Sequence, residues 1–121
     1  LLAYWEDACA VTGVKHPTLL RASHIIPWAR CESDQERLNV HNGLLLVANL
    51  DAAFDAGLIS FGDDGNILIS GKLTPEDQEF SGIQPHLKLN RVHEQIMKRL
   101  SWHRANLFQG HTNNYIDGEV P

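Results

Sequence analysis

The sequence predicts an α+β domain, on the strength of three observations. Two short apolar runs, residues 19–26 and 43–47, are bounded by turn-forming and polar residues, as strands are. Two further β-rich runs, residues 58–61 and 67–70, flank a segment whose Asp-Gly pair is typical of a hairpin turn. Apolar residues then recur at helical spacing over residues 89–108, which predicts the longest helix of the chain.

The N-terminal half begins with residues 1–8, which we interpret as the end of a helix. The strand over residues 19–26 should stop at Pro27, because proline has no amide hydrogen to donate to a ladder. Residues 29–42 are polar and irregular in pattern, which predicts a long loop before the strand at 43–47. Loops of that length usually carry function or motion.

Two short helical segments are predicted in the middle of the chain. The first spans residues 49–57, with Asn49 as its N-cap and Gly57 as its C-terminal stop. The second is a helical turn over residues 74–80, capped by Thr74 and followed by proline at its first position.

One apolar stripe runs along the predicted C-terminal helix. His103 lies on this stripe, so we expect it in the core or in an interface rather than in catalysis. The tail from Gly110 onward is polar and is expected to be loose. The other members of the stripe are Leu89, Val92, Ile96, Leu100 and Leu107.

The size and composition predict a single domain over residues 1–121. With 43% hydrophobic residues, the chain can bury a core without disulfides. Its 21% charged content and three tryptophans argue against disorder. No apolar run approaches the roughly 18 residues of a membrane span. The chain begins with Leu1 rather than methionine, so we expect it to be the C-terminal part of a longer protein.

The two cysteines, Cys9 and Cys31, do not form a CxxC pair, which argues against a cysteine-based zinc site. A disulfide between them is compatible with the sequence. Two free thiols in a reducing compartment are the preferred interpretation, and we therefore expect a cytoplasmic protein.

The net charge of -5 is unevenly distributed. Residues 88–104 contain five basic residues and one acidic residue, whereas the rest of the chain has five basic and fourteen acidic residues. A basic segment of this kind is compatible with contact to phosphate, and a solvated helix face is the alternative. The candidate nucleic-acid contacts are Arg91, Lys98, Arg99 and Arg104.

The predicted helix over residues 49–57 carries two aspartates, Asp51 and Asp55. Spacing of four places both carboxylates on one face of a helix, one turn apart, where they repel each other. The helix dipole favours an acid near the N-terminus but not one near the C-terminus, so it explains Asp51 and not Asp55. A divalent cation between them would resolve the conflict, and carboxylate oxygens suit Mg²⁺ or Mn²⁺.

Two motifs identify a family resemblance. The run ASHIIPW at residues 22–28 and the run NGLLLVANLDAAFDAGLISF at residues 42–61 resemble the HNH endonuclease family, in the branch with Ser-His-Ile-x-Pro-Trp, Asn-Gly-Leu-Leu-Leu and Phe-Asp-x-Gly-Leu-Ile. CAVTG at residues 9–13 and the pair His103-Arg104 are similar to that branch more weakly.

This resemblance implies a ββα-metal core over residues 19–61, with an added β-hairpin and flanking helices. In the family fold, a hairpin packed on a helix holds one divalent cation against the scissile phosphate. By position, His24 corresponds to the general base, and Asn42 to the residue that braces the loop and orients the histidine. His41, beside Asn42, is a weaker candidate for a direct role.

The resemblance also implies the metal ligands. Asp51 and Asp55 lie where the family has ligands on its helix, although the wider family often has histidine or asparagine at the first position. Ser23 lies where the wider family usually has an aspartate or histidine ligand. These three residues are therefore the candidate ligands, and Mg²⁺ or Mn²⁺ is the expected ion.

The resulting hypothesis is a metal-dependent DNA endonuclease domain, the cleavage module of a restriction-type protein whose N-terminal region supplies target recognition. The alternative is a catalytically silent nucleic-acid-binding domain of the same fold, which Ser23 and the acidic balance favour slightly. A hydrolase with Ser23 as nucleophile is disfavoured, because adjacent strand residues point to opposite faces and no nucleophile-elbow pattern is present.

Overall fold

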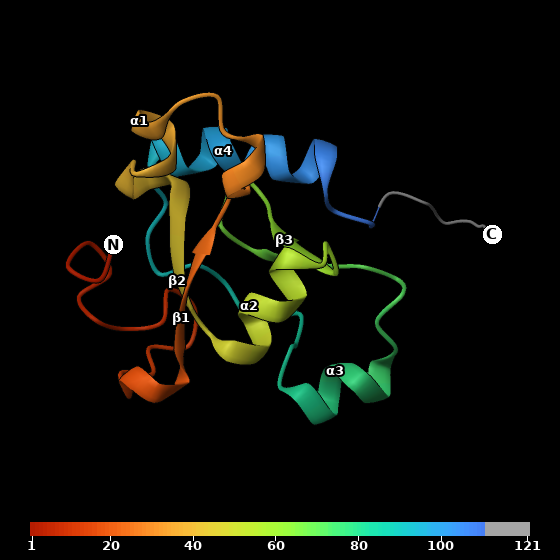
Figure 1. Cartoon of the computed structure of the whole chain (residues 1–121). Coiled ribbons are helices and arrows are strands. Elements are labelled where there is room, and N and C mark those ends of the chain that lie inside the picture. The colour runs from red at the N-terminus through yellow and green to blue at the C-terminus, as the bar shows by residue number, and fades with distance from the viewer. Residues whose placement is uncertain (111–121) are drawn as a thin grey trace.

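The structure is a computed structural model that describes residues 1–110, and it confirms the α+β class. Residues 111–121, which make up most of the tail predicted to be loose, lie outside the described residues. Two small antiparallel sheets and four short helices alternate along the described part of the chain (Figure 1).

The first sheet pairs β1 (Leu20–His24) with β2 (Gly43–Val47), in a register that sets His24 opposite Gly43. The helix α2 (Ala48–Asp55) follows β2 directly and packs against both strands (Figure 1). These three elements form the ββα unit that the resemblance implied. The second sheet is the predicted hairpin, with β3 (Ile59–Phe61) paired to β4 (Ile67–Ile69).

The core lies between the first sheet, α2 and the C-terminal helix α4 (Glu94–Asn106). The three leucines in the middle of β2 are fully buried, as expected of a strand with an uninterrupted apolar run. His103 of α4 is also buried, as predicted, with its ring stacked on Phe54 at a centroid separation of 3.9 Å. A remaining helix, α3 (Pro75–Ser81), starts as predicted, with the Thr74 hydroxyl accepting from the backbone N–H of Asp77.

Two helix predictions were wrong at their boundaries. Residues 1–8 form turns rather than the end of a helix, and Glu6 and Asp7 both have positive φ angles. The C-terminal helix starts at Glu94, capped by His93, rather than at residue 89. Leu89 lies before the helix, where its backbone N–H donates to the carbonyl of Gly65 and its side chain packs in the core, so its burial does not reflect a helical stripe.

Two further details differ from the sequence predictions. The N-cap of α2 is Val47, and the side chain of Asn49 instead donates to the backbone carbonyl of Ser81. Gly57 ends the helix as predicted, with a φ of 76°. The segment predicted as an irregular loop contains the one-turn helix α1 (Asp34–Arg37), which Ser33 caps through its hydroxyl.

The cysteines are both buried and free, which agrees with the preferred interpretation. Within residues 1–110, no helix combines the length and hydrophobicity that a membrane crossing requires.

Candidate active site

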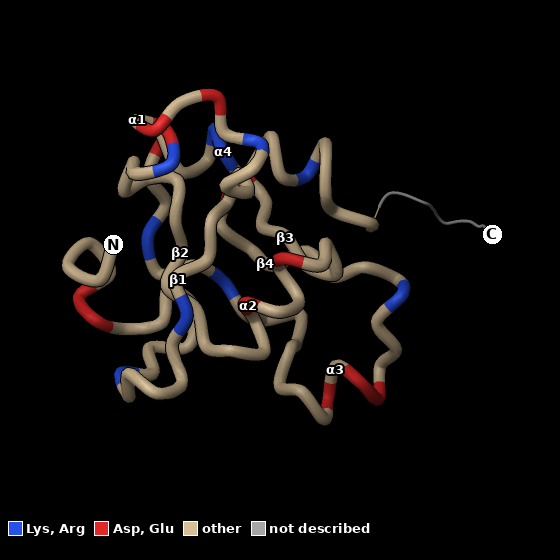
Figure 2. The backbone as a smooth tube through the Cα atoms, in the orientation of Figure 1, with Lys and Arg blue, Asp and Glu red and all other residues tan. Residues whose placement is uncertain are grey.

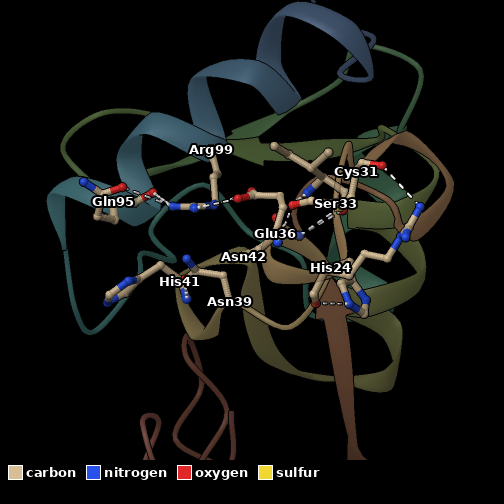
Figure 3. Close-up of polar contacts among 11 residues, drawn as sticks. His24, Cys31, Ser33, Glu36, Asn39, His41, Asn42, Gln95 and Arg99 are labelled. Carbon is tan, nitrogen blue, oxygen red and sulfur yellow. Dashed lines mark hydrogen bonds and ion pairs between the residues drawn. The ribbon is translucent and has the colours of Figure 1, made fainter.

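His24 lies at the end of β1, half-buried, beneath the segment that contains α1 (Figure 3). Its Nε2 atom is 3.2 Å from the backbone carbonyl oxygen of Arg37. Because a carbonyl oxygen can only accept, this contact places the ring proton on Nε2 and leaves the lone pair on Nδ1. The edge of the ring faces Trp28, with centroids 5.6 Å apart. The geometry thus fixes Nε2 and leaves Nδ1 without a hydrogen-bond partner among the described residues.

Asn42 is fully buried and clamps the chain just after His24. Its Oδ1 accepts from the backbone N–H of Ile26 at 2.8 Å, and its Nδ2 donates to the carbonyl of the same residue at 3.1 Å. The same amide group lies 3.5 Å from the sulfur of Cys31. This double contact fixes the backbone two residues beyond the histidine, at the position for which the resemblance implied a bracing role.

Asp55 of α2 lies within electrostatic reach of both His24 and Asp51. Burial raises the pKa of the Asp55 carboxyl above its ordinary value, and the charge of Asp51 raises that pKa further. The charge of His24 acts in the opposite direction and lowers it. Asp55 therefore lies near His24 of β1, and Asp51 lies near Asp55 on the same helix.

Ser23 is buried, and within residues 1–110 its Oγ atom is the buried side-chain polar atom without a hydrogen-bond partner. Together with His24 and Arg37, it lines a cavity of about 260 Å³. The described residues contain no cluster of three or more His, Cys, Asp and Glu that could hold a metal. A site built on two aspartates would leave positions for water or phosphate oxygens, as Mg²⁺ and similar ions typically require. Asp51, Asp55 and the Ser23 hydroxyl are the candidate oxygen donors.

The predicted nucleic-acid contacts fall into two groups. Lys98 is exposed and forms no ion pair with any residue in the described range. The three arginines each bind an acid that is distant in sequence: Arg91 binds Glu6, Arg99 binds Glu36 and Arg104 binds Asp63. The guanidinium groups that the sequence predicted to contact phosphate thus already form ion pairs within the domain.

His41 lies outside this arrangement of His24, Asp51 and Asp55. Its ring stacks on His93 with centroids 4.1 Å apart. Burial lowers the pKa of His41, and the charges of His93 and Arg99 lower it further. Sequence reasoning missed the Arg37 carbonyl and the Glu36–Arg99 pair, since a backbone atom has no sequence signal and the pair spans 63 positions.

Residues 9–62 match a protein-family model described as HNH endonuclease. No curated protein matches the chain. The matched segment contains β1, α1, β2, α2 and β3, and with them the histidine, the asparagine and both aspartates described above.

Proposed function

The chain belongs to the HNH endonuclease family through residues 9–62, and from this premise we propose that it is a metal-dependent DNA endonuclease domain that hydrolyses phosphodiester bonds. The observation that carries the proposal is the geometry of His24: Nε2 lies 3.2 Å from the Arg37 carbonyl oxygen, Nδ1 has no hydrogen-bond partner among the described residues, and the ring lies within electrostatic reach of Asp55 on α2.

His24 acts as the general base. Its Nδ1 takes a proton from the attacking water, and the Arg37 carbonyl stabilises the imidazolium that results, because Nε2–H is already its donor. General-base catalysis of this kind typically contributes roughly 10²- to 10⁴-fold to the rate. Asn42 keeps the base in place by fixing the backbone at Ile26.

Asp51, Asp55 and the Ser23 hydroxyl would hold the divalent ion. Two observations support this donor set: the mutual repulsion that contributes to the raised pKa of Asp55, and the unpartnered buried Oγ of Ser23. When bound, Mg²⁺ or Mn²⁺ acts as a Lewis acid that stabilises charge on the phosphoryl and leaving oxygens.

DNA is the proposed substrate, with Lys98 as the exposed cation that contacts its phosphates. Contacts to phosphate position a protein on a duplex but carry no sequence information. We therefore propose a cleavage module of restriction type that relies on another part of the protein for its target.

A plasmid-nicking assay with and without Mg²⁺ or Mn²⁺ tests the proposal. The parent domain should nick DNA only with metal, His24→Ala should not, and His86→Ala should behave like the parent, because His86 is an exposed histidine outside the site. A folded parent that binds DNA but nicks it with neither metal would favour the catalytically silent alternative instead.

A further inference from the structure

The helix α1, which supplies the Arg37 carbonyl, has no apolar anchor of its own. It has four residues, none of them buried, and the following residue, Leu38, is 77% exposed. A single helical turn is marginal in water, because one turn cannot repay the entropy of its own nucleation. The position of α1 over His24 must therefore come from polar contacts with the rest of the domain.

One bidentate ion pair provides such a contact. The Nε and Nη2 atoms of Arg99 donate to the two carboxylate oxygens of Glu36 at 2.8 and 2.9 Å (Figure 3). The third guanidinium nitrogen donates to the backbone carbonyl of Gln95 at 2.9 Å, which fixes the arginine on its own helix. The side chains of Arg99 and Glu36 are only 11% and 27% exposed, so solvent screens this pair less than a pair at the open surface. A two-point contact of this type also fixes orientation, which a single contact does not.

Apart from the contact of the Arg37 carbonyl with His24, the other polar contacts of α1 stay close to the loop. The guanidinium of Arg37 donates to the carbonyls of Trp28 and Cys31 and pairs with Asp34. These bonds give the loop its internal shape. Asn42 fixes only the beginning of the loop, at Ile26 and Cys31. Within residues 1–110, the ion pair of Glu36 ties α1 itself to α4, and Arg30, earlier in the loop, lies over the Trp102 ring of the same helix at 5.1 Å.

We propose that Arg99 and Glu36 are positioning residues for the general base: their ion pair holds α1, and thereby the adjacent Arg37 carbonyl, over Nε2 of His24. This inference deepens the proposed function and rests on it. It also separates two neighbours that the sequence grouped together, since Arg99 serves the geometry of the site and Lys98 serves DNA binding. The lowered pKa of Glu36, caused first by its hydrogen bond from Arg99, keeps the carboxylate ionised for this role.

Arg99→Ala and Lys98→Ala form a matched pair for kinetic tests on plasmid DNA. Arg99→Ala should lower the saturating single-turnover nicking rate by about 10- to 100-fold, a range typical of a displaced catalytic group, and should change DNA affinity by less than about twofold. Lys98→Ala should do the reverse, weakening binding and flattening its salt dependence by about one phosphate contact. A loss of affinity without loss of rate in Arg99→Ala would overturn the assignment.

Removal of the acidic partner, in Glu36→Ala, distinguishes a phosphate-binding role of Arg99 from a positioning role. If Arg99 contacts phosphate, removal of Glu36 frees the guanidinium and strengthens DNA binding. If the pair positions α1, Glu36→Ala should lose rate as Arg99→Ala does, and the double variant should be no slower than either single variant. Additive losses would show that the two side chains act separately.

Nuclear magnetic resonance can measure which nitrogen of the His24 ring carries the proton, independently of DNA cleavage. In the parent, the ¹⁵N shifts of the His24 ring should show the Nε2–H form at slightly alkaline pH, and Lys98→Ala should keep it. Arg99→Ala should give a mixture of both ring forms, with folding checked by thermal melting. If Arg99→Ala does not fold, the measurement uses Arg99→Lys instead, which keeps the positive charge but cannot form the bidentate contact with Glu36. An unchanged ring form in a folded variant would overturn the positioning role, whereas a changed ring form in a domain that never nicks DNA would overturn only the proposed function.

Discussion

His24 and His103 are two histidines of one small domain with opposite surroundings. His24 is half-buried and, among the described residues, hydrogen-bonds through Nε2 alone. His103 is fully buried, and both of its nitrogens are occupied, Nδ1 by the Ser60 hydroxyl at 2.8 Å and Nε2 by the Phe54 carbonyl at 3.0 Å. Burial lowers the pKa of His103 to about 4, against the opposing effect of the Phe54 carbonyl. A ring with a spare nitrogen can exchange protons with a substrate, whereas a ring without one serves the fold.

The difference extends to how each histidine is held. The ring of His103 is held by stacking and by elements with large buried side chains. The ring of His24 is held by a carbonyl from a one-turn helix with no buried residue. Changes at His24 should therefore alter activity with little effect on stability, and changes at His103 should do the opposite.

The largest expected effect comes from His24→Ala. Loss of the general base should reduce metal-dependent nicking by roughly 10²- to 10⁴-fold. DNA binding and the melting temperature should stay close to those of the parent, because the side chain is only half-buried. Nicking kinetics together with thermal melting check this. An unfolded His24→Ala beside a fully active His24→Gln would mean that the residue is structural.

His103→Ala should instead reduce the free energy of unfolding by about 3 kcal/mol. The substitution opens a cavity against Phe54 and leaves the Ser60 hydroxyl and a backbone carbonyl buried without their partner. Urea unfolding at neutral pH measures the loss, with the exposed His86→Ala as control. Equal stability of the two variants would contradict a structural role for His103.

The pH dependence of stability should carry the signature of His103. Its pKa of about 4 in the folded state lies below the value of 6.5 for an unperturbed histidine, so the unfolded chain binds more protons below that value. The contribution is therefore complete above pH 6.5 and is lost as the pH falls to about 4, with a total of roughly 3 kcal/mol. Urea unfolding between pH 7 and pH 4 should show this loss, and His103→Gln should show a correspondingly flatter profile.

The sequence predicted elements well where local pattern and tertiary environment agree. The bounds of β2 follow directly from its apolar run, and the hairpin of β3 and β4 from its Asp-Gly turn. It failed where a distant contact decided the local structure. Leu89 fits the helical spacing but lies before the helix, where its backbone N–H donates to Gly65. Asn49 is a residue type that favours the N-cap, but its side chain donates to the backbone carbonyl of Ser81.

In the candidate site, too, the residues in local motifs could be predicted, and the contacts between distant residues could not. His24, Asn42 and the aspartates carry a motif, so their proximity could be expected from the resemblance. The ion pair of Arg99 with Glu36 joins residues that share no motif, so the sequence does not predict it. The basic stretch suggested contact with phosphate, because the sequence does not reveal which basic side chains already have acidic partners. Figure 2 illustrates this, since acidic positions of α1 lie beside basic positions of α4.

The smallest expected effect concerns Asp51 and Asp55, and it tests the metal half of the proposed function. Without metal, Asp51→Asn or Asp55→Asn should stabilise the domain by a few tenths of a kcal/mol, because each removes a like-charge contact within one helical turn. With Mg²⁺ or Mn²⁺, the parent should gain melting temperature and both variants should gain less, because an ion that binds only the folded state stabilises it. We expect Asp51→Asn to be the more damaging, since Asp51 lies at the more regular ligand position of the motif. Calorimetric titration with Mn²⁺ decides this, with the exposed Asp7→Asn as control for the lost charge. If both α2 variants bind Mn²⁺ as the parent does, the carboxylates are not ligands, and His24 would have to act beside a metal held elsewhere or without one.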